Sequence, residues 1–232
     1  MGWKNALITK LQWSETISNL PEKEAIARQI TEKVKDGLII GAGSGSTVHL
    51  ALFHIAAKIK SQHLQITIIP ASTETSLTCM QLGIPQVSLK EMQPDWTFDG
   101  ADEVDPAKNL IKGRGGAMFK EKLLISSSSQ TFILADRTKL VEQLGSHFPI
   151  PIEIYPGALS LVEKNLKQLK AIEITLRTGK GKDGPVITEN GNFILDVHFN
   201  NITEELEKEI KIIPGVIESG LFIGYPVEII TP

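Results

Sequence analysis

The chain has 232 residues, 41% of them hydrophobic, and its 24 basic and 27 acidic residues give a formal net charge of −3. This length can bury a core in one large domain or in a domain plus a smaller one, and the balanced charge lacks the basic excess of a nucleic-acid-binding protein. One cysteine, no apolar run near the roughly 18 residues of a membrane span and no signal-like N-terminus predict a cytoplasmic protein that binds no membrane.

The first predicted helix follows an N-terminal extension, residues 1–20, to which we assign no function. Apolar side chains then recur every four residues, between a proline near the start and a glycine at the end: Ile26, Ile30 and Val34. That interval is typical of a helix with one buried face. Lys23 falls in its first turn, where a lysine is usually a solvated charge.

A glycine-rich turn joins a short buried strand, 38–40, to an apolar helix, 48–59. Backbone N–H groups and the helix dipole both face such a turn, so a strand, a glycine turn and a helix N-terminus together form an anion site. The turn reads GAGSGST and offers three hydroxyl groups around bare backbone. We expect one phosphate group to bind at its second half: Ser44, Gly45, Ser46 and Thr47.

Two better-known phosphate motifs do not fit this turn. The dinucleotide fingerprint requires a glycine or alanine where Ser46 stands, and an acidic residue after the next strand. That strand, 65–69, ends instead in Pro-Ala-Ser. The P-loop requires a Gly-Lys-Ser/Thr ending, and this turn has no lysine. After it, 72–82 is predicted to form a helix capped by Ser72 or Thr73.

Four acidic side chains follow the short predicted strand 96–98: Asp99, Asp102, Glu103 and Asp105. In open α/β sheets, ligands bind outside the carboxyl ends of the strands, which is where Asp99 would lie. Gly100 and Ala101 keep the backbone accessible to a ligand. A second glycine-rich turn contains Lys112, Gly113, Arg114 and Gly115. Glu121 follows within about the first two turns of a predicted helix, 117–125.

The acidic stretch has three simpler interpretations. Charge runs are most often solvated loops, but these acids alternate with small residues and begin at a strand end. A calcium loop does not fit, because the EF-hand pattern D-x-D-x-D-G has its glycine after the third acid, whereas Gly100 directly follows the first. Spacing alone leaves Mg²⁺ bound by Asp99 and Asp102 as an alternative. The five histidines form no metal-binding pair, and each is more typical of a structural or exposed residue.

Strand 131–135 precedes Lys139, which we place at the same edge of the first sheet as Asp99.

The last third of the chain has a different pattern. From Pro149 the predicted order is strand 150–154, helix 158–169, strands 171–176 and 193–197, helix 203–212 and strand 216–222. Asn190-Gly191 is a strong signal for a hairpin turn before the third of these strands. The order βαββαβ is ferredoxin-like.

The predicted fold class is α/β with an additional α+β domain. Residues 21–148 should form a mostly parallel, Rossmann-like sheet with helices on both faces, and 149–222 a ferredoxin-like lid domain. The tail, 223–232, is short, and the sequence leaves open whether it returns to the main sheet.

Three motifs together resemble the active-site region of ribose-5-phosphate isomerase, type A: DGADEVD from Asp99, IKGRGGA around Lys112, and Glu121-Lys122. The spacings between Asp102, Lys112 and Glu121 match those of the family without gaps. The resemblance runs from about Pro21 to Leu221. One departure is Thr75, where the family often has a lysine.

The resemblance implies the reaction and the residues that perform it. Ribose 5-phosphate and ribulose 5-phosphate would interconvert through an enediolate in the non-oxidative branch of the pentose phosphate pathway, with no cofactor and no metal. Glu121 would be the base, Lys112 the charge at the oxyanion, and Asp99 and Asp102 the groups that hold the hydroxyls. The remaining substrate contacts would come from the 44–47 loop, 100–101, 113–115, Lys139 and Lys23. We expect a homodimer or homotetramer.

Two other functions remain to be distinguished. A sugar-phosphate-sensing domain would bind without turnover and would not need Glu121. An amino-sugar phosphate deaminase would share the fold but needs an acid–histidine arrangement that the sequence lacks. For the isomerase, at least one of Asp99 and Asp102 should face Lys112 and should therefore have a low pKa.

Overall fold

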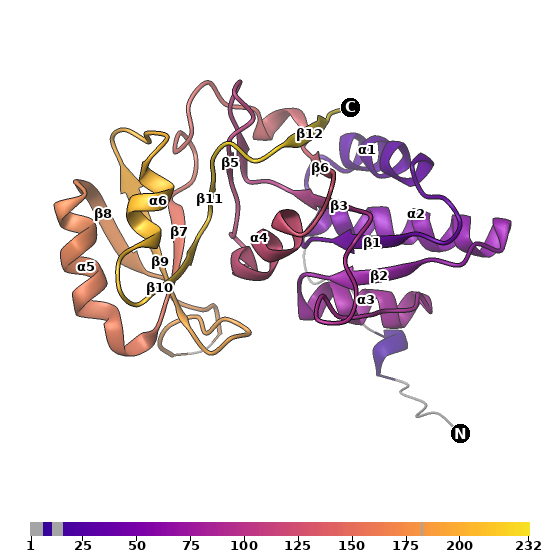
Figure 1. Cartoon of the computed structure of the whole chain (residues 1–232), viewed down its shortest axis with the longest axis horizontal. Coiled ribbons are helices and arrows are strands. Elements are labelled where there is room, and N and C mark those ends of the chain that lie inside the picture. Colours follow the sequence, from indigo (N-terminus) through magenta and orange to yellow (C-terminus); the bar gives the residue numbers. More distant parts are fainter. Residues whose placement is uncertain (1–6, 11–15, 182) are drawn as a thin grey trace. The chain divides into compact units, whose positions relative to one another are not determined.

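The computed structural model describes residues 7–10, 16–181 and 183–232 (Figure 1). The chain divides into two compact units. The first comprises Met1–Gly100, Leu124–Arg137 and Glu228–Pro232, and the second Ala101–Leu123 and Thr138–Val227. The expected N-terminal extension lies mostly outside the described residues, apart from the short 3₁₀ helix η1 (Ile8–Lys10) and the segment that leads into the first α-helix.

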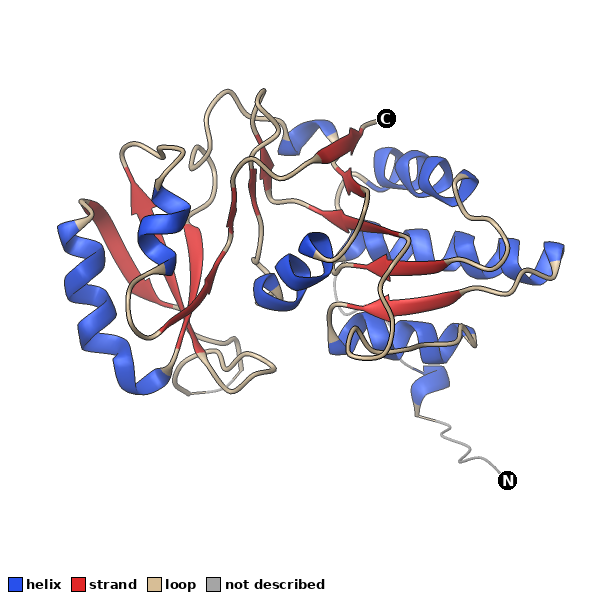
Figure 2. Ribbon diagram, in the orientation of Figure 1, coloured by secondary structure: helices blue, strands red, loops and turns tan. Residues whose placement is uncertain are grey.

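The first unit contains a five-stranded sheet with the order β12-β6-β3-β1-β2 (Figure 2). Its strands are β1 (Ile39–Ala42), β2 (Thr67–Pro70), β3 (Trp96–Gly100), β6 (Thr131–Leu134) and β12 (Val227–Ile230). The pairs β1–β2, β1–β3 and β3–β6 are all parallel. The predicted parallel sheet is therefore confirmed, and the carboxyl ends of β1 and β3 lie at the same edge.

Helices cover both faces of this sheet, as predicted. The helices are α1 (Leu20–Glu32), α2 (Ser46–Gln62), α3 (Thr73–Leu82) and α4 (Met118–Ser126), the last of which ends in this unit. Residues of α1 and α2 pack with Ile40 and Phe98 in the larger core. Leu124 of α4 packs on the opposite face, with Ile69. This division follows from the strands, where successive side chains point to opposite faces.

The tail returns to the main sheet, which settles the question that the sequence left open. β12 is the neighbour of β6, and the N–H of Ala135 donates to the carbonyl oxygen of Ile230 at 3.0 Å. Ile230 is buried with the larger core of the first unit. The last residues therefore help to close the first unit, although most of the chain between β6 and β12 belongs to the second.

The second unit contains a four-stranded antiparallel sheet with the order β10-β7-β9-β8. Along the chain its elements are β7 (Ile150–Ile154), α5 (Leu159–Gln168), β8 (Ala171–Leu176), β9 (Phe193–Phe199), α6 (Leu206–Lys211) and β10 (Val216–Ser219), with η3 (Pro156–Ala158) before α5. Both helices pack on one face, where Val162 and Ile210 are fully buried with Ile152. This is the predicted ferredoxin-like arrangement.

A second, three-stranded sheet in this unit was not expected. It has the order β11-β5-β4 and consists of two-residue strands: β4 (Glu103–Val104), β5 (Leu110–Ile111) and β11 (Leu221–Phe222). The predicted strand 216–222 is split at Gly220, whose N–H donates to Pro151 O and whose carbonyl oxygen accepts from Lys112 N. A Cβ at Gly220 would lie 2.1 Å from the Lys112 carbonyl oxygen, so only glycine fits.

The compact units do not follow the expected domain boundary after residue 148. Residues 101–123 and 138–148 group with the second unit instead of the first. The physical reason is the three-stranded sheet, because β4 and β5 complete their hydrogen bonds with β11. The ferredoxin-like elements are thus one part of a larger unit that also carries the second glycine turn.

Candidate active site

The first group of candidate residues surrounds the glycine turn between β1 and α2 in the first unit. Gly45 is the residue before α2, and its φ of +91° with ψ of 178° is a backbone conformation nearly restricted to glycine. Within the described residues, no side chain caps α2. The first-turn N–H groups of a 17-residue helix therefore face the turn, and this arrangement favours an anion.

Asp99 shapes this turn from the end of β3. Its side chain is fully buried, and its Oδ1 accepts hydrogen bonds from Ser44 N at 3.1 Å and Gly100 N at 2.7 Å. A Cβ at Gly43 would lie 1.9 Å from the Asp99 carboxyl group, so the close approach requires glycine. Thr75 of α3 adds a second support by donating to the carbonyl oxygen of Gly43 at 2.6 Å.

Lys23 supplies a positive charge at the same place. It projects from α1, is only 5% exposed, and its Nζ lies 3.0 Å from Ser46 Oγ in the first turn of α2. Its Nζ is also 4.0 Å from Asp136 Oδ2, and Asn19 donates to the other oxygen of that carboxylate. A buried ammonium group beside a helix N-terminus makes the anion site stronger than the turn alone would be.

The second group belongs to the second unit and centres on a buried ion pair. Lys112 Nζ lies 3.2 Å from Glu121 Oε2, and both residues are 3% exposed. Lys112 follows β5 directly, and Glu121 lies in the first turn of α4. The turn between them needs glycine at Gly113 and Gly116, whose φ angles are +97° and +83°.

Asp102 completes this group. Its Oδ2 accepts a hydrogen bond from the N–H of Arg114 at 3.1 Å. Burial raises the pKa of the Asp102 carboxyl, and the charge of Glu121 adds to that effect. The Arg114 N–H and the charges of Lys112 and Lys139 act in the opposite direction without cancelling the cost of burial. Asp102 is therefore not the aspartate with the expected low pKa, because desolvation outweighs its positive neighbours.

Arg114 and Lys139 lie against the same aromatic ring. The Arg114 guanidinium carbon is 5.1 Å and the Lys139 Nζ 5.2 Å from the centroid of Phe148. The backbone at Phe148 is fixed by Glu103, a fully buried carboxylate that accepts from Gly145 N, His147 N and Phe148 N at 2.6–2.8 Å. Cation–π contact of this kind orients two positive side chains that the sequence places far apart.

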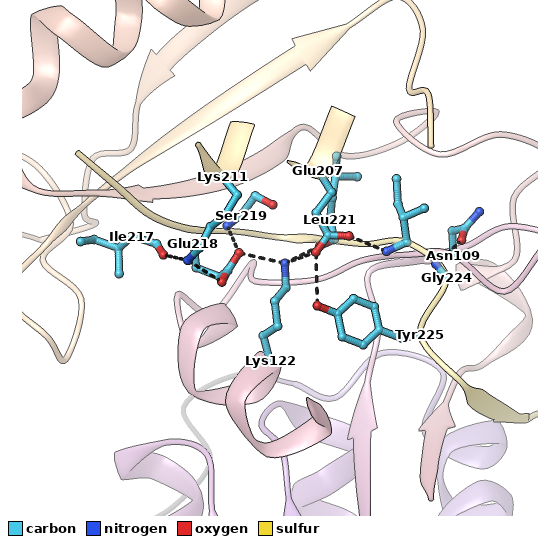
Figure 3. A network of polar contacts seen from close by, with 11 residues as sticks. Asn109, Lys122, Glu207, Lys211, Ile217, Glu218, Ser219, Leu221, Gly224 and Tyr225 are labelled. Carbon is cyan, nitrogen blue, oxygen red and sulfur yellow. Dashed lines mark hydrogen bonds and ion pairs between the residues drawn. The ribbon is translucent and has the colours of Figure 1, made fainter. Parts of the chain in front are cut away.

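Lys122, next to Glu121 on α4, makes a separate buried network (Figure 3). Its Nζ donates to Glu207 Oε1 at 2.6 Å, to Glu218 Oε1 at 3.0 Å and to the Leu221 carbonyl oxygen at 2.6 Å. The ammonium also lies 4.5 Å from the centroid of the Phe222 ring. Because consecutive helical side chains point in different directions, this anchor fixes the rotation of α4 while Glu121 faces Lys112.

The structure therefore places the predicted site residues in two sets. One set lies in the first unit: Lys23, Ser44, Gly45, Ser46, Thr47, Asp99 and Gly100. The other lies in the second: Ala101, Asp102, Lys112, Gly113, Arg114, Gly115, Glu121 and Lys139. Sequence reasoning missed the supporting roles of Glu103, Thr75 and Lys122. Their partners lie far along the chain, so no local spacing identifies them.

Two absences hold for the part of the chain that the structure describes. No group of three or more histidine, cysteine, aspartate or glutamate side chains is arranged to hold a metal ion there. Within the same residues, none of the helices is long and apolar enough to cross a membrane.

Comparison with known proteins gives a consistent result. The family model for ribose 5-phosphate isomerase A (phosphoriboisomerase A) matches residues 67–231. The ribose-5-phosphate isomerase A of Thermosynechococcus vestitus is 43% identical over 206 residues, 87% of each chain. That of Methanocaldococcus jannaschii is 44% identical over 209 residues, 89% of this chain and 92% of the relative.

Solved structures agree with the sequence comparisons. The M. jannaschii ribose 5-phosphate isomerase A superposes with a TM-score of 0.88 at 41% identity, covering 91% of this chain and 95% of that one. A D-ribose-5-phosphate isomerase in complex with phospho-erythronic acid also gives 0.88, at 37% identity over 92% of this chain and 95% of that one. The buried acid–lysine pair, the glycine turns and these similarities over most of the length lead to one assignment: the chain belongs to the ribose-5-phosphate isomerase A family.

Proposed function

We propose that this protein interconverts D-ribose 5-phosphate and D-ribulose 5-phosphate through an enediolate, as an aldose–ketose isomerase of the non-oxidative pentose phosphate pathway. Family membership supports the reaction, and one observation supports the way the chain performs it. Lys112 and Glu121 form a buried pair at 3.2 Å, with the partly buried carboxyl of Asp102 among the groups that interact with them. These three side chains together offer a base, a positive charge and a second proton carrier.

Glu121 is the base in this proposal. It removes the proton from C2 of the open-chain aldose, the electron pair of the C–H bond forms the C1–C2 double bond, and negative charge develops on O1. The ammonium of Lys112 stabilises that charge, because a preorganised charge in a site with little water is worth more than one in water. Glu121 then returns the proton to C1, while the hydroxyl proton of O2 is transferred to O1, which gives the ketose with its carbonyl at C2 and a hydroxyl at C1.

The two aspartates have different proposed roles. Asp102 binds the sugar hydroxyls and assists ring opening, and its raised pKa makes the carboxylate a better proton acceptor than an ordinary aspartate. Asp99 uses Oδ1 to hold the backbone of Ser44 and Gly100, so its main proposed contribution is the shape of the glycine turn. Arg114 and Lys139 supply further positive charge, held in place by Phe148.

The Ser44–Thr47 turn, with Lys23, is the proposed phosphate site. The free helix N-terminus, the hydroxyls and the ammonium 3.0 Å from Ser46 Oγ together match a phosphate group. Binding energy from this non-reacting group helps to position the sugar for reaction. The relative solved with phospho-erythronic acid fits this proposal, because that ligand carries a phosphate and a carboxylate in one small molecule.

The state of the protein in the cell is proposed on less direct grounds. A homodimer or homotetramer in the cytoplasm, acting on a small sugar phosphate and using no cofactor, fits the family and the single buried cysteine. Light scattering on the purified protein measures the mass. A monomer at micromolar concentration would contradict the oligomeric part of the proposal without affecting the reaction.

The proposed function is tested by following ribulose 5-phosphate formation from ribose 5-phosphate with the wild type, Glu121→Gln and the exposed control Glu142→Gln. We expect kcat to fall by about 10²–10⁴ in Glu121→Gln, because the amide keeps the shape but accepts no proton. Binding of a sugar phosphate should change little. Exchange of the C2 proton with deuterated solvent reports the base directly. Wild-type exchange in Glu121→Gln would place the base elsewhere, and absence of turnover in the wild type would favour a sensing domain.

A further inference from the structure

Arg177 lies one residue after the end of β8 and is held by an aspartate of the neighbouring strand. Its Nε donates to Asp196 Oδ2 at 2.8 Å, and its Nη2 donates to Asp196 Oδ1. Asp196 lies on β9, opposite Thr175 of β8. The pair is bidentate and mostly buried, with 16% of the arginine and 21% of the aspartate side chain exposed. This geometry fixes the plane of the guanidinium group.

The remaining nitrogen of Arg177 points at the second glycine turn. Nη1 donates to the carbonyl oxygens of Gly113 at 3.1 Å and Arg114 at 2.9 Å. Both carbonyls belong to the turn that separates Lys112 from Glu121. The arginine that follows β8, oriented by Asp196, therefore holds the backbone on which the proposed catalytic residues depend. Neither the aspartate nor the arginine takes part in the proposed chemistry.

One peptide unit joins this arginine to Asp102. The carbonyl group of Gly113 and the N–H of Arg114 belong to the same trans peptide, so they point in opposite directions. The carbonyl oxygen accepts from Arg177, and the N–H donates to Asp102 Oδ2 at 3.1 Å. A cation on the carbonyl side polarises the peptide and strengthens the hydrogen bond on the N–H side. The turn is also held in one orientation, with the N–H directed at the carboxylate.

We propose that Arg177, oriented by Asp196, is a positioning residue that acts through the Gly113–Arg114 peptide to keep Asp102 in place and in its ionised form. The proposal rests on the proposed role of Asp102 in binding and ring opening. It adds a residue more than 60 positions away in sequence that touches neither substrate nor reacting atoms.

The charged groups that face Asp102 set the direction of the expected effect. Burial and Glu121 raise the pKa of the Asp102 carboxyl, while the Arg114 N–H, Lys112 and Lys139 lower it. Loss of Arg177 leaves Lys112 and Lys139 in place and weakens only the hydrogen bond from the Arg114 N–H, which lowers the pKa of Asp102. The pKa of Asp102 should then rise further, so more of this carboxyl is protonated at mildly acidic pH. If activity needs the Asp102 carboxylate, the variant without Arg177 should lose activity at a higher pH than the wild type as the solution is acidified.

The test compares Arg177→Met, Arg177→Lys and the control Lys167→Met, which removes an exposed ion pair with Glu163 in the same unit. Two quantities are measured for each: kcat/KM against pH, and the carbon-13 chemical shift of the Asp102 carboxyl against pH, assigned with Asp102→Asn. In Arg177→Met we expect the acidic limb to move to higher pH and kcat/KM on that limb to fall about fivefold, the factor for one hydrogen bond. Arg177→Lys keeps the positive charge but not the planar, bidentate guanidinium group, so its kcat/KM should lie between those of Arg177→Met and the wild type. The control should match the wild type.

The carboxyl titration separates this proposal from the proposed function. If the Asp102 signal titrates as in the wild type in Arg177→Met, the proposal is wrong, whatever happens to the rate. If the titration moves and the pH profile does not, Arg177 still acts on Asp102 but the proposed role of Asp102 fails. Should Arg177→Met not fold, Asp196→Asn leaves the arginine present but unoriented, and a smaller shift in the same direction is expected. An unchanged titration in a folded Asp196→Asn would likewise overturn the proposal.

Discussion

Asp99 and Asp102 are three residues apart and chemically identical, yet their surroundings give them different tasks. Asp99 accepts from two backbone N–H groups and thereby shapes the glycine turn of the first unit. Asp102 accepts from one N–H and interacts with two lysines and a glutamate in the second. A buried carboxylate that accepts hydrogen bonds from backbone N–H groups has a structural role, whereas one with a raised pKa is available for proton transfer.

The raised pKa of Asp102 predicts that this residue lowers the stability of the fold. A folded-state pKa above the unfolded value means that the native chain binds the proton more tightly, so stability falls as pH rises between the two values. The cost is fully present above the raised folded-state pKa. Asp102→Asn removes the charge, and we expect it to raise Tm at pH 7, with the gain shrinking as pH falls from the folded-state pKa towards the unfolded value. Turnover and substrate binding should both be weakened.

Thermal unfolding at several pH values, with the exposed Asp183→Asn as a control, measures this effect. The control should change Tm little at any pH, since surface substitutions are usually within about 0.5 kcal/mol. A lower Tm for Asp102→Asn at neutral pH, or a gain that grows on acidification, would contradict the assigned direction.

At the scale of elements, each set of proposed site residues depends on a helix that begins immediately beside a glycine turn. α2 begins directly after Gly45 and presents its N-terminus, while α4 begins two residues after Gly116 and presents Glu121. In both cases the helix is fixed by a lysine, Lys23 against Ser46 and Lys122 against Glu207 and Glu218. The glycine turns provide access to backbone, and the buried lysines provide rigidity.

The phosphate role of the first turn is tested by Gly45→Val. A Cβ at Gly45 meets no atom within 4 Å, so the fold has room for it, but φ of +91° makes the backbone strained, at a cost of about 1–3 kcal/mol. Gly37→Val is a matched control, because its φ is +79° and its Cβ also meets nothing within 4 Å. Both variants should lose stability. Only Gly45→Val should raise KM for ribose 5-phosphate, and free ribose should be a far poorer substrate than its phosphate for the wild type. Equal KM values for ribose 5-phosphate in the two variants would show that the phosphate group does not bind at this turn.

The anchor of α4 is tested by Lys122→Met. The methionine keeps the length of the stem but removes the ammonium from two carboxylates whose side chains are 13% and 10% exposed. Breaking one partner of a buried ion pair costs about 3–5 kcal/mol, so urea denaturation should show a loss of that order. Lys120→Met on the same helix removes an ion pair in which 41% of the lysine side chain is exposed, and it should cost about 1 kcal/mol or less. Comparable losses in the two variants would mean that the Lys122 network is not the anchor.

At the scale of the whole molecule, the sequence predicts the elements well where their signals are local. Strands 150–154 and 171–176 are found with their observed bounds, because alternating apolar residues and nearby turns mark both ends. The candidate acids, Lys112 and the glycine turns were also identified, since they form short motifs. The roles assigned to them stay predictions until the experiments above are done.

What the sequence does not predict depends on partners far along the chain. β4, β5 and β11 have two residues each, too few for a periodic pattern, and they pair only because residues 110–111 meet 221–222. β12 is recognisable as a strand only once β6 lies beside it. Arg177 and Asp196 resemble an ordinary surface pair until the fold brings Gly113 to them. Such long-range contacts decide the compact units, which is why the boundary after residue 148 is displaced.

The intact protein should be active without a metal ion. Asp99 and Asp102 were the alternative ligands for Mg²⁺, but Asp99 Oδ1 already accepts from two N–H groups and Asp102 Oδ2 from one. The positive charge that a metal would supply to the enediolate is already offered by Lys112, 3.2 Å from Glu121. Dialysis against EDTA should therefore leave kcat and KM unchanged, and Mg²⁺ or Mn²⁺ added afterwards should have no effect. Activity that is lost on dialysis and restored by either ion would show that the two aspartates are ligands, and a metal ion would then share the charge at the oxyanion that we assign to Lys112.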